Sequence, residues 1–134
     1  MRVRRNGSGV AAAVLINKRG QALVLKRGVT APWKPGFWNL PGGMVDPGET
    51  TKAAARRETE EEIELSPTGL LPLAVWTDPE GWTLEAFITD QWSGEPKVTW
   101  ESDGYAWINH ADLAHLRFVP GVKETLQAAF DAIK

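Results

Sequence analysis

The sequence contains no cysteine. Disulfide bridges, cysteine nucleophiles and thiolate metal ligands are therefore excluded, and any metal ion must be held by oxygen or imidazole ligands. The absence fits the reducing cytoplasm, where we expect the protein to act. The sequence also lacks a run of the ~20 apolar residues that a helix needs to cross a bilayer, so no association with a membrane is predicted.

Neither sign of charge is in large excess, because 15 Lys and Arg oppose 17 Asp and Glu and leave a net charge of −2. A nearly neutral chain has no overall electrostatic attraction for a nucleic acid polymer or an anionic lipid surface. Of the 134 residues, 43% are hydrophobic and 24% are charged, which is typical of a folded globular protein. We expect one domain over residues 1–134.

Hydrophobic patterning in the first half predicts strands followed by a helix. Two apolar segments, Val10–Ile16 and Ala22–Leu25, flank a polar link and are expected to pair as a hairpin. Residues 28–39 contain two prolines and two glycines, which indicates a long loop, and loops of this length are often functional. Strong helix formers then predict a helix that ends at Ile63 and is capped by Thr50 or Thr51.

The second half is predicted to hold three further strands and two helices. The strands are expected at Leu70–Trp76, Trp82–Asp90 and Gly104–Ile108, and a short helix at Ala111–Leu116. A last helix follows Pro120, because apolar residues recur there at helical spacing. Strands and helices do not alternate strictly, so the predicted fold class is α+β: a mixed β-sheet sandwiched between helices in an α/β/α arrangement.

Four glutamates crowd residues 58–62 of the predicted helix. Like charges at this spacing weaken a helix by about 0.2–0.5 kcal/mol per pair. Glu58, Glu61 and Glu62 stand at i, i+3 and i+4, so their side chains share one face. Such a face suits a hard cation such as Mg²⁺ or Mn²⁺, whose charge would offset the repulsion. A run of glutamates taken alone is more often a solvated surface, and the residues upstream decide between the two interpretations.

The residues before this helix carry a spaced motif. Residues 38–49 read Trp-Asn-Leu-Pro-Gly-Gly-Met-Val-Asp-Pro-Gly-Glu, and residues 57–65 read Arg-Glu-Thr-Glu-Glu-Glu-Ile-Glu-Leu. The segment 43–65 resembles the signature of the Nudix hydrolases, in particular the small MutT-like members. The matching positions are Gly43, Glu49, Arg57, Glu58, Glu61 and Glu62. The resemblance covers about a sixth of the chain and implies a Nudix-like fold.

Two positions depart from the family's pattern. Thr59 stands where an apolar residue is usual, and we expect its methyl group to pack against the sheet. Glu64 replaces the glycine that normally ends the helix. Because a left-handed conformation costs a glutamate roughly 1–2 kcal/mol, we expect the helix to end in another way.

The resemblance implies roles for the matching residues. Four groups would bind the divalent ion, either Mg²⁺ or Mn²⁺: the side chains of Glu58, Glu61 and Glu62 and the backbone carbonyl of Gly43. Glu58 is also the first candidate for the base that deprotonates the attacking water. Arg57 would pair with Glu49 and hold the loop against the helix. The implied reaction is metal-dependent hydrolysis of a diphosphate linkage.

Further candidates lie outside the motif. Glu101 resembles the second carboxylate that some family members use as a ligand or base, and Glu85 is a weaker candidate for that role. Arg27 ends the second predicted strand, where family members often place a phosphate-binding arginine. Trp33 and Trp38 flank the long loop and are candidates for stacking on a nucleobase, although ordinary packing accounts for them equally well.

The implied function is a nucleotide pyrophosphohydrolase acting on nucleoside di- or triphosphates as its small-molecule substrates. Hydrolysis of ADP-ribose or of dinucleoside polyphosphates stays open, because the motif does not encode the substrate. Hydrolases of dinucleoside polyphosphates tend to show Pro-Lys-Gly where this sequence has Pro-Gly-Gly at 41–43. A non-catalytic nucleotide-binding module is disfavoured, because all the motif carboxylates are present. A monomer and a homodimer are both compatible with the sequence.

Overall fold

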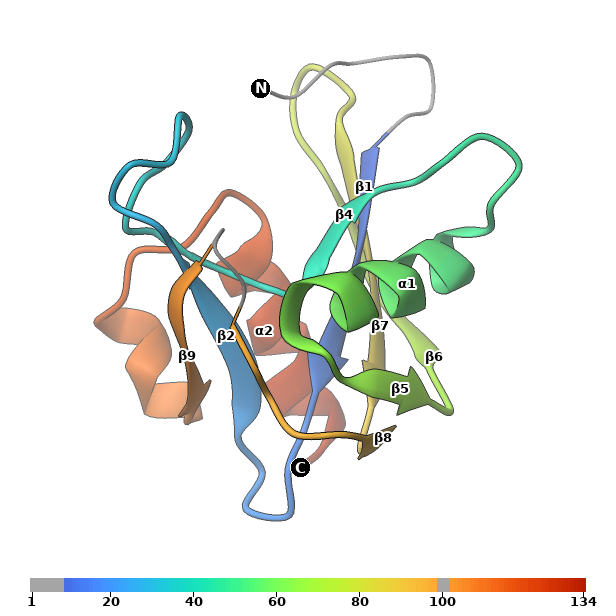
Figure 1. Ribbon diagram of the computed structural model, residues 1–134. Coiled ribbons are helices and arrows are strands. Elements are labelled where there is room, and N and C mark those ends of the chain that lie inside the picture. The colour runs from blue at the N-terminus through green and yellow to red at the C-terminus, as the bar shows by residue number, and fades with distance from the viewer. Residues whose placement is uncertain (1–8, 99–101) are drawn as a thin grey trace.

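The computed structural model describes residues 9–98 and 102–134, which form strands and helices in the order shown in Figure 1. The strands are β1 (Gly9–Leu15), β2 (Ala22–Arg27), β3 (Trp38–Asn39), β4 (Gly42–Met44), β5 (Ser66–Thr68), β6 (Leu71–Thr77), β7 (Thr83–Thr89), β8 (Gln91–Ser93) and β9 (Ser102–Ile108). The helices are α1 (Thr51–Ile63), α2 (Val122–Ala132) and the short 3₁₀ helix η1 (His110–Ala114). None of these helices is both long and apolar enough to cross a membrane.

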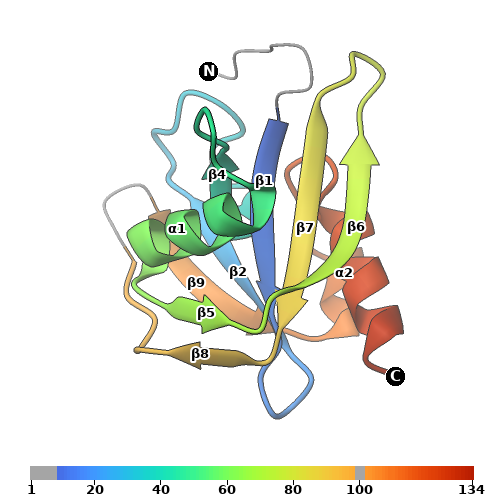
Figure 2. The same ribbon diagram turned by 90° about the vertical axis from the view of Figure 1, so that its right-hand side faces the viewer.

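The strands form a mixed arrangement of three sheets. One sheet has the order β4-β1-β7-β6, a second has the order β3-β2-β9, and β5 pairs with β8. The pairing of β1 with β7 is parallel, whereas β4 and β6 run antiparallel to their neighbours. The two longer helices lie on opposite sides of the sheet that contains β1 and β7 (Figures 1 and 2). The predicted α+β class, with sheets between helices, is confirmed.

The predicted hairpin between β1 and β2 is wrong. The chain does reverse between them, but only one bridge, Ile16 to Ala22, joins the two segments. β1 instead pairs with β4 and β7, and β2 pairs with β3 and β9. A strand that is buried on both faces reads as a continuous apolar run and takes a central place beside a parallel partner. The run Gly9–Leu15 has that character, and its partner β7 lies far away in the sequence.

Alternate residues of β1 supply both halves of the core. Ala11, Ala13 and Leu15 pack with Ala54 and other residues on the α1 side. The intervening residues of β1 pack with Leu126 and its neighbours in α2 on the other side. Small side chains on both β1 and α1 let the helix lie close to the sheet. The core therefore holds α1, and the acidic residues it carries, against β1 and β4.

Helix α1 begins as expected and ends in a way that contradicts the prediction. Thr50 is the N-cap, and its hydroxyl accepts a hydrogen bond from the Ala53 amide at 3.1 Å. Thr59 is fully buried, as its predicted packing requires, and its hydroxyl donates to the Ala55 carbonyl. Glu64, however, does adopt the left-handed conformation, with φ 60° and ψ 29°. That turn places the next residue, Leu65, fully in the core, and the burial offsets the backbone strain.

Replacing Glu64 by Gly is expected to raise the free energy of unfolding by about 0.5–1 kcal/mol, because glycine adopts a left-handed conformation without the steric cost. Chemical denaturation of the purified variant measures the change. The matched control is Lys52→Gly at an exposed helical position of α1, which should lower stability by about 1 kcal/mol. Equal destabilisation by both substitutions would show that the left-handed cap carries no strain.

Candidate active site

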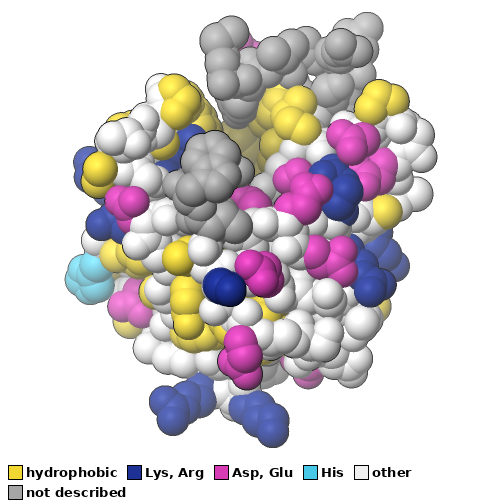
Figure 3. All heavy atoms as spheres, viewed as in Figure 1, with side chains coloured by type: hydrophobic (Ala, Val, Ile, Leu, Met, Phe, Trp, Pro, Cys, Tyr) yellow, Lys and Arg dark blue, Asp and Glu magenta, His cyan; other side chains and the backbone are white. Residues whose placement is uncertain are grey.

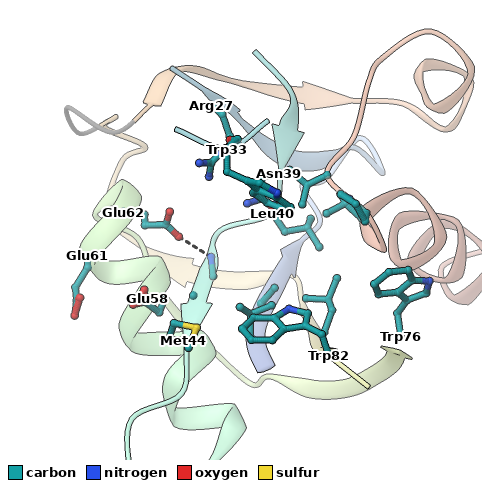
Figure 4. A pocket seen from close by; sticks show the side chains of 18 of the residues that line it. Arg27, Trp33, Asn39, Leu40, Met44, Glu58, Glu61, Glu62, Trp76 and Trp82 are labelled. Carbon is teal, nitrogen blue, oxygen red and sulfur yellow. Dashed lines mark hydrogen bonds between the residues drawn. The ribbon is translucent and has the colours of Figure 1, made fainter. Parts of the chain in front are cut away.

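The acidic face of α1 forms one wall of a pocket of about 450 Å³. Glu58, Glu61 and Glu62 all line it, together with Gly43 and Met44 of β4 (Figure 4). Acidic side chains are grouped over α1 and the loop that precedes it, around a basic side chain (Figure 3). The three glutamates therefore line the same cavity, as their spacing along the helix predicts.

The glycine pair allows the two carboxylates nearest β4 to approach its backbone. Glu62 Oε1 accepts a hydrogen bond of 2.6 Å from the Gly42 amide. The carboxylate of Glu58 lies directly against Gly43, where an added Cβ would be 2.5 Å from Glu58 Cδ. Only glycine leaves that space to the carboxylate. The sequence Gly42-Gly43 therefore brings backbone and carboxylate oxygens together at one edge of the pocket.

Arg57 ties the loop before α1 to the acidic face. Its Nε and Nη2 donate to the two carboxylate oxygens of Glu49 at 2.8 and 3.0 Å, and Nη2 also donates to the Met44 carbonyl. Nη1 donates to Glu58 and Glu61, each at 3.0 Å. Hydrogen bonds from Arg57 lower the pKa of Glu49, and the surrounding carboxylates raise the pKa of Arg57 above its already high value.

Replacing Arg57 by Lys is expected to lower the free energy of unfolding at neutral pH below that of wild type, because an ammonium group cannot donate two parallel hydrogen bonds to the Glu49 carboxylate as a guanidinium does. The pKa of Glu49 is lowered in the folded protein, so its contribution is fully present above pH 4.5 and is lost as the pH falls through the lower folded value. The free energies of unfolding of wild type and Arg57→Lys, measured by denaturation at several pH values, should therefore become equal in acid.

The control for this substitution is Arg56→Lys on the same helix. Arg56 forms an ion pair of 3.5 Å with Glu60, and the two side chains are 52% and 40% exposed. An exposed pair of this kind contributes about 0–1 kcal/mol, so the control should be close to wild type. A stability of Arg57→Lys equal to that of the control would contradict the structural role of the Arg57–Glu49 pair.

The donor atoms around Gly43 fit a divalent cation in their chemistry. Carboxylates and a backbone carbonyl are the hard oxygen ligands that Mg²⁺ and Mn²⁺ prefer. Within residues 9–98 and 102–134 no three acidic or histidine side chains are already gathered around one point, and Arg57 engages two of the three carboxylates. A cation bound there would share the carboxylates of Glu58 and Glu61 with Arg57, since each carboxylate has two oxygens.

The other predicted site residues have different positions. Arg27 and Trp33 line the pocket, and the Arg27 guanidinium lies 5.5 Å from the centre of the Trp33 ring while its Nε donates to the Trp33 carbonyl. Trp38 is not part of the lining and packs against the core instead. Glu85 accepts a hydrogen bond of 2.9 Å from Thr51 at the start of α1. Glu101 falls outside the described residues.

Two aromatic pocket residues were not predicted from the sequence, namely Trp76 of β6 and Trp82 just before β7. Seven tryptophans occur in the chain, and a lone sequence has no signal that separates the ones at a cavity from the ones in the core. The parallel pairing of β1 with β7 brings Trp82 to the cavity, and it brings Trp76 there as well because β6 pairs with the other edge of β7. The resulting pocket has an acidic wall and an aromatic wall (Figure 4).

Known proteins resemble the chain over most of its length. The model of the NUDIX domain matches residues 6–129. The chain is 34% identical over 119 residues to "Putative 8-oxo-dGTP diphosphatase 2" of Mycobacterium tuberculosis, covering 83% of this chain and 79% of the relative. It is 32% identical over 127 residues to nucleoside triphosphatase NudI of Escherichia coli, covering 84% and 90%.

The fold has a counterpart among solved structures. A structure of MutT, from a study of the Aliivibrio salmonicida and Vibrio cholerae proteins, superposes with a TM-score of 0.79 at 25% identity and covers 93% of this chain and 98% of that one. This likeness agrees with the order of strands and helices described above. The domain match over residues 6–129, together with relatives above 30% identity, shows that the chain belongs to the Nudix family and is a Nudix hydrolase.

Proposed function

We propose that the protein hydrolyses the diphosphate linkage of a nucleoside di- or triphosphate. The observation that carries the proposal is a single pocket whose one wall is the carboxylate face of α1 and whose other wall is aromatic. The first wall suits a cation-bound phosphate chain, and the second suits a flat base. The names of the two relatives, a diphosphatase for 8-oxo-dGTP and a nucleoside triphosphatase, support the same class of substrate.

In this proposal the acidic face provides both ligands and a base. Glu58, Glu61, Glu62 and the Gly43 carbonyl hold the divalent ion, Mg²⁺ or Mn²⁺. When bound, the ion neutralises charge on the phosphate oxygens and lowers the pKa of the attacking water. Glu58 accepts a proton from that water, since its carboxylate lies at the edge of the pocket beside β4. The ion pair of Arg57 with Glu49 holds the loop that precedes α1 against the helix.

The rest of the pocket positions the substrate. Arg27 lies at the pocket with a guanidinium available to phosphate oxygens, and the Trp33 ring beside it offers a surface for stacking. The volume of about 450 Å³ is at the lower end of the range for small-molecule sites, which is about 300–1,000 Å³. A cavity of this size suits one nucleotide better than the two nucleosides of a dinucleoside polyphosphate.

A substrate panel tests the proposal. Purified protein with Mg²⁺ is incubated with nucleoside di- and triphosphates, ADP-ribose and dinucleoside polyphosphates, and kcat/KM is measured for each. We expect the highest values for nucleoside di- or triphosphates and no turnover in the presence of EDTA. Preferential hydrolysis of ADP-ribose or of a dinucleoside polyphosphate would replace the proposed substrate class, and a lack of turnover with every compound would refute the proposal.

A further inference from the structure

Trp76 closes the end of the pocket that lies opposite the acidic wall. In Figure 4 the three glutamates of α1 lie on one side, the Trp76 ring lies on the other side beside α2, and Trp82 lies between them. Trp76 belongs to β6, the edge strand of its sheet, and is paired with Leu84 of β7. A substrate whose phosphates face the glutamates therefore extends its other end towards Trp76.

Gly121 holds the Trp76 ring in this position. Gly121 precedes α2, and a Cβ added to it would lie 2.6 Å from Cε3 and 2.7 Å from Cδ2 of the Trp76 ring. Real Cβ atoms do not approach other atoms so closely, so the ring already occupies all the space that the glycine leaves. With Gly121 directly behind it, the ring cannot retreat towards α2 to make room for a longer ligand.

Apart from the indole N–H groups of Trp76 and Trp82, the side chains that line the pocket near Trp76 carry few hydrogen-bond donors or acceptors. The lining residues at the start of β7 and at the start of α2 are apolar or aromatic: Trp82, Leu84, Val119, Pro120 and Val122. Among the described lining residues, Arg27 and the three glutamates carry charged groups, and Asn39 carries the one side-chain amide; no lining side chain has a hydroxyl. Asn39 Oδ1 already accepts a hydrogen bond of 2.9 Å from the Leu40 amide. A base in this part of the pocket meets surfaces that respond to shape rather than to a pattern of donors and acceptors.

We propose that Trp76, fixed by Gly121, is the specificity-determining residue that limits the length of the base, and that the base is selected by size and stacking. The inference rests on the proposed function, because it places the phosphates of a nucleotide at the acidic wall. It implies that the pocket accepts a nucleotide with a single flat base. It also implies that the pocket accepts bases of similar size whose hydrogen-bond donors and acceptors differ. It also implies that a smaller residue at position 76 admits a longer base.

The test compares two α,β-methylene nucleoside triphosphates, which resist hydrolysis: one carries adenine and the other carries a benzo-fused, lengthened adenine. Calorimetric titration with Mg²⁺ measures both dissociation constants for wild type, Trp76→Ala and Trp76→Leu. Wild type should bind the adenine compound more tightly by about tenfold or more, since pockets of fixed shape discriminate by roughly that factor for small size differences. Both variants should weaken adenine binding, strengthen binding of the lengthened base and so reverse the preference.

Trp107→Ala is the matched control. The Trp107 ring stacks on the Trp92 ring, with 5.5 Å between the two ring centres, and does not line the pocket. Its loss should therefore leave the ratio of the two dissociation constants unchanged. An unchanged ratio in both Trp76 variants, or a wild type that does not distinguish the two bases, would overturn the inference.

The outcomes also separate this inference from the proposed function. If wild type binds the adenine compound but hydrolyses no nucleotide, the proposed function fails, and the ratio of dissociation constants still decides the role of Trp76. If wild type hydrolyses nucleotides but the ratio does not move in the Trp76 variants, only the inference fails. If wild type binds neither compound, both are refuted.

Discussion

Glu62→Gln is expected to lower kcat for nucleotide hydrolysis by at least about a hundredfold, since even the groups that only support metal ligands contribute 10–100-fold. Glu62 Oε1 accepts the Gly42 amide hydrogen at 2.6 Å, and a glutamine oxygen can accept the same bond. The substitution therefore removes a negative charge from the acidic wall while it preserves the contact with β4. Loss of activity in a folded variant would then show that the negative charge of Glu62 is required.

Glu60→Gln provides the matched control on the same helix. Glu60 pairs with exposed Arg56 and is not part of the pocket lining, so kcat should stay within about twofold of wild type. Steady-state rates with Mg²⁺, together with the affinity of each variant for Mn²⁺, measure both effects. A Glu62→Gln enzyme with nearly normal kcat and normal affinity for Mn²⁺ would show that Glu62 is not a metal ligand.

Gly43→Ala is expected to have an equally large effect by a steric route. The new methyl group would lie 2.5 Å from Glu58 Cδ, so the Glu58 carboxylate must leave its place beside β4. We expect activity to fall by at least about a hundredfold, and stability to fall by about 1–3 kcal/mol, as for other overpacked positions. Thermal or chemical unfolding and steady-state kinetics measure the two losses separately.

A double-mutant cycle isolates the contact. In a Glu58→Ala background the stability cost of Gly43→Ala should largely vanish, while activity stays low because the proposed base is absent. Gly42→Ala serves as the comparison, since a Cβ there would lie 2.8 Å from the Ala12 backbone and would not involve Glu58. Additive stability losses for Gly43→Ala and Glu58→Ala would contradict the close packing of this glycine against the carboxylate.

The local features of the site could be predicted from the sequence because short-range spacing determines them. The start of α1 at Thr50 follows from capping chemistry, and the shared face of Glu58 and Glu62 follows from the helical repeat. The ion pair of Glu49 with Arg57 came from the family resemblance, which correctly placed two residues eight positions apart in contact. Each of these predictions needed only a segment of the chain, or a known motif.

The features that could not be predicted depend on contacts between distant segments. The central position of β1 comes from its parallel pairing with β7, which no local pattern specifies. Glu64 adopts a left-handed conformation because burial of Leu65 outweighs the backbone cost, and that balance is visible only once the core is known. Trp76 reaches the pocket through the same sheet, whereas Trp38, nearer to the motif in sequence, packs in the core.

The most direct test of the central claim is the identity of the products formed from a nucleoside triphosphate. Wild-type protein and Mg²⁺ should convert it to a nucleoside monophosphate and pyrophosphate, and both EDTA and Glu62→Gln should suppress that conversion. Release of orthophosphate as the sole small product would place the cleavage at the terminal phosphate and contradict the expected release of pyrophosphate. Product formation that persists with EDTA and in the variant would contradict metal-dependent hydrolysis of a diphosphate linkage at the acidic wall of α1.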